Sequence, residues 1–114
     1  ALPLWFFVDQ HNEVVLRPET RDGGRDLILR KSPGGPVDTV VELKLWRENN
    51  VGVDVIDATF SAMTRNKAKH GLIITTSQFT KPALERAKEF GIECWDGRKL
   101  LEELYKHQYF KAPT

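Results

Sequence analysis

The sequence predicts an α/β fold in which helices flank one mixed β-sheet, with a β-hairpin at the N-terminal end. Two observations indicate this class. In the first half of the chain, apolar and polar residues alternate and short connections separate the segments, which is typical of antiparallel strands. In the second half, segments of helical periodicity alternate with short apolar runs, and such strand–helix–strand links imply parallel pairing with right-handed crossovers.

The first half has the pattern of four strands, at residues 4–8, 14–16, 25–31 and 39–46. The first is aromatic, and the polar stretch at 9–12 separates it from the second, so the two are expected to form the hairpin. The third and fourth alternate apolar and polar residues on either side of a Gly- and Pro-rich turn at 32–36. The fourth is expected to be central, and its Glu42 and Lys44 share a face because they are two positions apart.

The second half predicts helices and strands in alternation, at residues 53–69, 72–74, 81–90, 92–95 and 98–108. Ile56, Phe60 and Met63 recur at helical spacing in the first helix. Thr80 and Gly91 are residue types that begin and end helices, and they bracket the second helix. The run at 72–74 is short and continuously apolar, as in a strand that is buried on both faces.

The composition of the chain excludes several classes of protein. The 114 residues suit a single domain, residues 1–114, and a first residue other than Met suggests a part of a longer protein. A net charge of +1, from 17 basic and 16 acidic residues, excludes a globally basic, histone-like binder.

The single cysteine, Cys94, excludes a disulfide framework, and it is expected to be a buried strand residue rather than a nucleophile. No apolar run approaches the roughly 20 residues that span a bilayer, so no membrane association and a cytoplasmic location are expected.

The residues that carry chemistry are Asp26, Glu42 and Lys44. If the turn at 32–36 folds the third strand back along the fourth, the carboxylate of Asp26 can face that of Glu42. Two neighbouring carboxylates repel each other unless they share a cation, and Mg²⁺ prefers such oxygen ligands. A lysine beside them can hold an attacking water or neutralise charge on a phosphoryl transition state. The alternative for a Glu-x-Lys pair is an ordinary salt bridge, and such a pair alone usually belongs to a solvated strand face.

Several ordered motifs make residues 13–104 resemble the catalytic domain of the Mrr-type restriction endonucleases, in the PD-(D/E)xK nuclease superfamily. The motifs are RDGGRDLI at 21–28, VVELKLWR at 40–47, VGV at 51–53 and GLIITTSQFT at 71–80. Two departures stand out. Arg25 replaces the proline of the superfamily motif, and the first ten residues look like a strand where relatives begin with a helix that carries a glutamate.

The resemblance implies a Mg²⁺-dependent DNA endonuclease, with Mn²⁺ as a substitute, that hydrolyses phosphodiester bonds in restriction or defence against foreign DNA. Asp26 and Glu42 match the family's acidic metal ligands, and the backbone carbonyl of Leu43 is the implied third protein ligand. Lys44 matches the catalytic lysine. A homodimer or larger oligomer is expected because cutting both strands needs two sites, and a separate recognition or sensor domain is expected in the full-length protein.

Four residues near this constellation are expected to contact nucleic acid: Arg21, Arg47, Thr76 and Ser77. For Thr76 and Ser77, capping of the helix that follows is the alternative. Two other functions remain open from the sequence. One is a nuclease-like module that binds or senses nucleic acid without cleaving it, and the other is a junction resolvase or RNase of the same superfamily.

Overall fold

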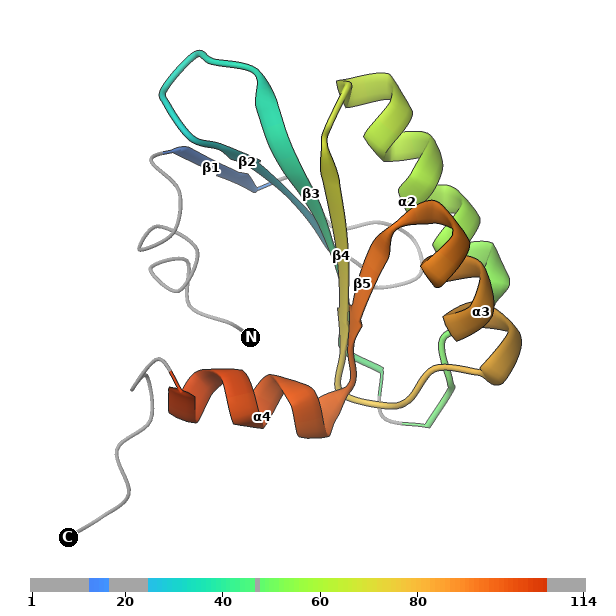
Figure 1. Ribbon diagram of the computed structural model, residues 1–114. Coiled ribbons are helices and arrows are strands. Elements are labelled where there is room, and N and C mark those ends of the chain that lie inside the picture. The colour runs from blue at the N-terminus through green and yellow to red at the C-terminus, as the bar shows by residue number, and fades with distance from the viewer. Residues whose placement is uncertain (1–12, 17–24, 47, 107–114) are drawn as a thin grey trace, which may run out of the picture.

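The computed structural model describes residues 13–16, 25–46 and 48–106, where it contains five strands and three helices (Figure 1). The strands are β1 (Glu13–Leu16), β2 (Arg25–Arg30), β3 (Val37–Lys44), β4 (His70–Thr75) and β5 (Ile92–Trp95). The helices are α2 (Val53–Asn66), α3 (Lys81–Phe90) and α4 (Gly97–Lys106). The predicted strand at 4–8 lies outside the described residues, as do the side chains of Arg25 and Asp26.

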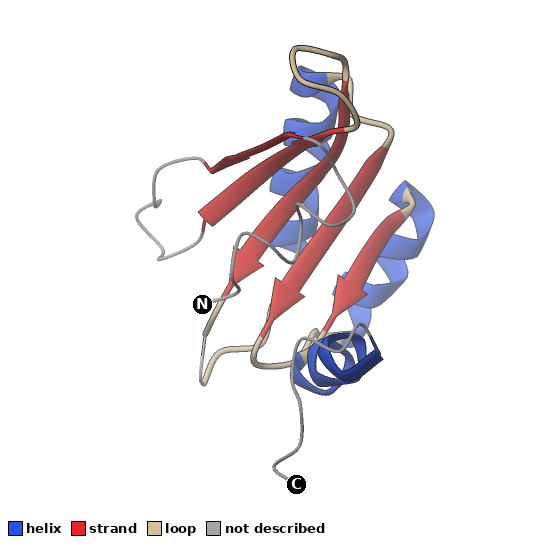
Figure 2. Ribbon diagram, turned by 90° about the vertical axis from the view of Figure 1, so that its left-hand side faces the viewer, coloured by secondary structure: helices blue, strands red, loops and turns tan. Residues whose placement is uncertain are grey.

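All five strands form one sheet in the order β1-β2-β3-β4-β5. β1 pairs with β2, and β2 with β3, in antiparallel orientation, whereas β3–β4 and β4–β5 are parallel. Figure 2 shows β3, β4 and β5 running in the same direction, with the start of α4 beyond their carboxyl ends. The predicted mixed sheet, antiparallel first and parallel afterwards, is confirmed, and β3 is its central strand.

Helices cover both faces of the sheet: α2 and α3 lie on one side and α4 on the other (Figure 1). The residues of β3 alternate between two cores, with Val40 in one and Val41 in the other. The α2/α3 core includes Ile28, Val40, Val51, Val55, Ile56, Ile73, Ala83, Ala87 and Ile92. The α4 core includes Leu27, Leu29, Val41, Leu43, Ile74, Trp95, Leu100 and Leu104.

The predicted start and stop signals of α3 are confirmed. The Oγ1 atom of Thr80 accepts a hydrogen bond from the backbone N–H of Ala83 at 3.2 Å, as an N-cap residue does. Gly91 ends the helix with a φ of 71°, a left-handed conformation that glycine adopts without steric cost. For α2 the predicted end at residue 69 is wrong: the helix stops at Asn66 because Lys67 turns left-handed, with a φ of 54°.

The predicted bounds of β3, 39–46, are also wrong at both ends. The strand begins at Val37 and ends at Lys44, where its pairing with β4 stops at Thr75. Beyond that point the backbone carbonyl of Trp46 accepts a hydrogen bond from the hydroxyl of Thr76, at 2.8 Å, in place of a ladder partner. A side-chain hydrogen bond from the neighbouring loop therefore replaces backbone pairing where β3 ends.

Within the described ranges, no helix has the length and apolar character needed to cross a membrane.

Ile73→Ala tests whether the α2/α3 core holds the central strands together. Ile73 is completely buried in β4, so the cavity is expected to lower the free energy of unfolding by about 2–5 kcal/mol in urea denaturation. The control is Leu84→Ala, because Leu84 is 48% exposed on α3 and its loss is expected to cost less than about 0.5 kcal/mol. Equal effects of the two changes would contradict this assignment of the core.

Candidate active site

The pairing of β2 with β3 determines where the predicted acidic residues lie. The register puts Asp26 directly opposite Glu42. Opposed residues of an antiparallel pair belong to the same face of the sheet. Lys44 lies two positions beyond Glu42 in β3, so it is on the same face. Helices α2 and α3 cover this face, because Val40, which also belongs to it, lies in their core. The backbone thus brings positions 26, 42 and 44 to one face of two adjacent strands.

Glu42 and Lys44 form a close ion pair at the carboxyl end of β3. The Nζ atom of Lys44 lies 2.9 Å from Oε1 of Glu42, and the two side chains are only 6% and 12% exposed, respectively. A pair so far removed from water is stable only while both partners are present, because either charge alone would lack compensation. The alternative of a salt bridge between Glu42 and Lys44 is confirmed, but the solvated strand face expected with it is wrong, because both side chains are largely buried.

The indole ring of Trp46 makes a second contact with the lysine. Nζ of Lys44 lies 5.6 Å from the centroid of the ring, within the range of a cation–π interaction. The ring is itself partly buried against the α2/α3 core. The ammonium group is thus held by a carboxylate and an aromatic face, which restricts a side chain that is otherwise flexible.

The loop after β4 is hydrogen-bonded to the chain that leaves β3. The hydroxyl of Thr76 donates to the carbonyl of Trp46, and that of Ser77 donates to the carbonyl of Asn49, both at 2.8 Å. The backbone N–H of Val51 donates to the carbonyl of Gln78, also at 2.8 Å. The predicted alternative of helix capping by Thr76 and Ser77 is wrong, since Thr80 caps α3. Their hydroxyls join two loops.

Beside these loops, at the carboxyl ends of the parallel strands, is an open pocket of about 480 Å³. Its lining comes from three separate parts of the chain: Glu48, Asn50, Thr76, Ser77, Gln78, Asp96, Gly97 and Arg98. None of these residues is apolar, so the pocket suits a polar ligand that forms hydrogen bonds. The sequence indicated Thr76 and Ser77 as contact residues. The other lining residues could not be predicted, because only the fold brings the three segments together.

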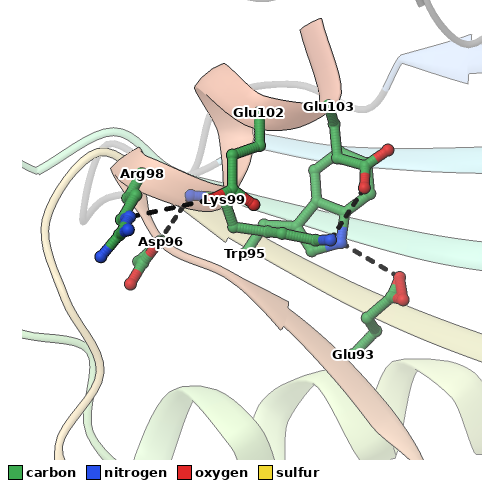
Figure 3. A network of polar contacts seen from close by, with 7 residues as sticks. All are labelled: Glu93, Trp95, Asp96, Arg98, Lys99, Glu102 and Glu103. Atoms are coloured by element: carbon green, nitrogen blue, oxygen red, sulfur yellow. Dashed lines mark hydrogen bonds and ion pairs between the residues drawn. The ribbon is translucent and has the colours of Figure 1, made fainter. Parts of the chain in front are cut away.

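Next to this pocket, polar contacts connect residues of β5 and α4 (Figure 3). Oδ1 of Asp96 accepts a hydrogen bond from the N–H of Lys99 at 2.8 Å and so caps α4. Nζ of Lys99 pairs with Glu103 at 2.8 Å, and the hydrogen bond to Glu103 raises the pKa of Lys99. Nε1 of Trp95 donates to Oε2 of Glu93 at 3.1 Å. These contacts hold the strand-to-helix corner in one conformation.

The donor set at Asp26, Glu42 and Leu43 suits a hard divalent cation. It combines two carboxylate positions that are opposed in the register with a backbone carbonyl between Glu42 and Lys44. Among the side chains that the structure describes, no group of three His, Cys, Asp or Glu residues is able to hold a metal ion. The predicted contact residues Arg21 and Arg47 lie outside the described residues.

Several known proteins are similar to this chain in sequence. The profile of the Mrr catalytic domain, described as a restriction endonuclease, matches residues 6–104. EcoKMrr, a type IV methyl-directed restriction enzyme of Escherichia coli, is 33% identical over 90 residues, which are 78% of this chain and 29% of that enzyme. The uncharacterized protein y4cE of Sinorhizobium fredii is 33% identical over 75 residues, 64% of this chain and 19% of that protein.

A solved structure shows the same fold. The DNA modification-dependent restriction endonuclease AspBHI matches with a TM-score of 0.60 and 19% identity, over 84% of this chain and 26% of that one. The predicted restriction-endonuclease-like fold is confirmed. The chain spans less than a third of the length of each of these three proteins.

The thiol of Cys94 is expected to be chemically inert. Burial, assisted by the negative charge of Glu93, raises the pKa of Cys94 from 9.0 to about 11. The unfolded chain releases this proton at a lower pH than the folded chain, so the thiol's contribution to stability is complete below pH 9 and is lost as pH rises toward 11. Urea denaturation at several pH values should show a smaller alkaline loss of stability for Cys94→Ala than for the unchanged protein. Identical pH profiles would contradict the shift.

Proposed function

Because the chain belongs to the Mrr-type restriction endonuclease family, we propose that it is the catalytic domain of a metal-dependent DNA endonuclease that hydrolyses phosphodiester bonds. The observation that carries this proposal is that positions 26, 42 and 44 share one face, at the start of β2 and the carboxyl end of β3. Restriction, or defence against foreign DNA, is the role that the family supports. Residues 1–114 are proposed to form this one domain within a longer protein.

In this proposal the carboxylates of Asp26 and Glu42 and the carbonyl of Leu43 hold Mg²⁺, with Mn²⁺ as a substitute. Two carboxylates and one ammonium leave a formal charge of about −1, which favours a bound cation electrostatically. When bound, the cation would supply Lewis-acid stabilisation of the phosphate and a more acidic water. The central position of β3 supports the proposal, because a strand paired on both sides keeps its ligands in fixed positions.

Lys44 is proposed to act on the phosphate and the attacking water. Its ammonium group has three N–H donors. One is directed to Glu42 at 2.9 Å, which also orients the ammonium group. In the proposed reaction the ammonium group donates to a water or to a phosphate oxygen whose negative charge grows in the transition state. The desolvated surroundings strengthen this interaction relative to one at an exposed lysine.

The polar pocket beside this constellation is proposed to receive the substrate strand next to the scissile phosphate. The amides of Asn50 and Gln78 and the guanidinium of Arg98 border it, and such groups bind base edges and phosphates. A net charge of +1 provides little attraction for DNA. We therefore propose that a further recognition or sensor domain, and a second copy of the chain, contribute to binding and to cleavage of both strands.

Lys44→Met tests the role proposed for the lysine. Cleavage of plasmid DNA with Mg²⁺ is expected to fall at least about a hundredfold. Removal of the ammonium leaves Glu42 unpaired at a site where its side chain is 12% exposed, so the variant is also expected to be less stable. Thermal denaturation of the variant and of the unchanged protein separates lost chemistry from lost folding. A folded, fully active Lys44→Met protein would refute the assignment.

Asp26→Asn tests the metal site. The change removes one negative charge without altering size, so the affinity for Mn²⁺, measured by isothermal titration calorimetry, and cleavage with Mg²⁺ are both expected to fall at least about tenfold. Asp57→Asn is the matched control, since Asp57 is an exposed carboxylate that pairs with Arg86 on the outer side of α2 and α3. Equal Mn²⁺ affinities of Asp26→Asn and Asp57→Asn would contradict the proposed ligand.

The same measurements separate the remaining functions. DNA binding that persists in EDTA, without cleavage in Mg²⁺ or Mn²⁺, would indicate a module that grips nucleic acid without cutting it. Preferential cleavage of branched DNA or of RNA would indicate a resolvase or an RNase of the same superfamily.

A further inference from the structure

We propose that Thr76 is a positioning residue for Lys44 and acts on it through Trp46. The inference rests on the proposed function, because it concerns the lysine to which we assign the chemistry. It assigns Thr76 a role in orienting that lysine, in place of the DNA contact expected from the sequence.

The contacts form a continuous path from the loop after β4 to the ammonium group. Oγ1 of Thr76 donates a hydrogen bond to the carbonyl oxygen of Trp46 at 2.8 Å. The ring of Trp46 lies 5.6 Å from Nζ of Lys44. The same Nζ is 2.9 Å from Oε1 of Glu42. Each step joins neighbouring groups, and the path ends at the atom whose position the proposed reaction needs.

The hydrogen bond of Thr76 stands where the sheet no longer fixes the chain. The pairing of β3 with β4 ends at Lys44 and Thr75, so Trp46 lies beyond the ladder. A backbone that leaves a strand is free to turn in several directions unless other contacts direct it. The hydroxyl of Thr76 fixes the carbonyl of Trp46 and thereby limits where the attached indole can lie.

The loop that carries Thr76 is itself held on both sides. Thr75 is completely buried, and its Oγ1 accepts a hydrogen bond from the backbone N–H of Ser77 at 3.1 Å. The hydroxyl of Ser77 donates to the carbonyl of Asn49 at 2.8 Å. A donor on so constrained a loop can position its acceptor, whereas a donor on a freely moving loop would follow it.

This arrangement argues against phosphate binding by the same hydroxyl. A threonine hydroxyl has one proton to donate, and in Thr76 that proton is directed to the carbonyl of Trp46. Only the oxygen lone pairs remain, and they repel phosphate oxygens, which are acceptors. To bind phosphate, the hydroxyl would have to give up the contact with Trp46.

Thr76→Val and Thr76→Ser provide the test. Valine keeps the shape and removes the donor, whereas serine keeps the donor. With Mg²⁺ and a DNA substrate, Thr76→Val is expected to lower kcat about tenfold and leave KM within about twofold, and Thr76→Ser is expected to restore kcat to within about twofold. Thr64→Val is the matched control, because the exposed Thr64 also donates to a backbone carbonyl, that of Phe60 at 3.0 Å, but within α2. It should match the unchanged protein.

A second measurement does not depend on cleavage. The ring current of Trp46 should shift the Cε proton resonances of Lys44 upfield in NMR spectra of the complete chain without DNA. This shift is expected to shrink in Thr76→Val and to persist in Thr76→Ser and Thr64→Val. A Thr76→Val protein with an unchanged shift overturns the proposal, as does a rise in KM at constant kcat, which would indicate a DNA contact. If the unchanged protein does not cleave at all, the proposed function fails, and the NMR comparison still decides whether Thr76 positions Lys44.

Discussion

The geometry of the proposed active site depends on the desolvated ion pair between Glu42 and Lys44 at the end of β3. Two opposite charges are stable there because β3 is paired along both edges and buried on both faces, which fixes the separation of the two side chains. A flexible segment would have to order both side chains at an entropic cost before the charges could attract each other. The buried cores on either side of β3 provide that order in advance, so the stability of the fold and the geometry of the proposed site have the same origin.

The register of β2 against β3 determines which residue of β2 lies beside the ion pair of Glu42 and Lys44. A one-residue slip would move Asp26 to the opposite face of the sheet. The structure contains such a shift, between Leu29 and Arg30, where Thr39 and Val37 are the successive partners and Asp38 is passed over. This bulge lies near the turn, far from Glu42, so it changes the pairing at one end of the strands and leaves Asp26 opposite Glu42 at the other.

The order and direction of the strands could be predicted from the sequence, because periodicity and connection length are local properties. The common face of Glu42 and Lys44 followed from alternation alone, whereas Asp26 joins them through the register of β2 against β3. The end of β3, the contact between Thr76 and Trp46, and the polar pocket could not be predicted in this way. Thr76 and Trp46 are 30 positions apart, and a single hydrogen bond with a net value of about 1 kcal/mol leaves no local pattern in the sequence. The end of α2 depends on one left-handed residue, Lys67, which is not a glycine and therefore gave no stop signal.

The domain separates two tasks between two kinds of structure. The residues with proposed catalytic roles lie on paired strands, whereas the residues that border the pocket lie on loops and at the corner before α4. Strands hold reacting groups with little freedom, and loops accept changes in side chains without disturbing the sheet. The pocket also combines Glu48 and Asp96 with a single cation, Arg98, among its lining residues. This balance of charge disfavours tight phosphate binding. In the proposed function the loops therefore influence substrate choice, and affinity comes from the additional domain and the second copy.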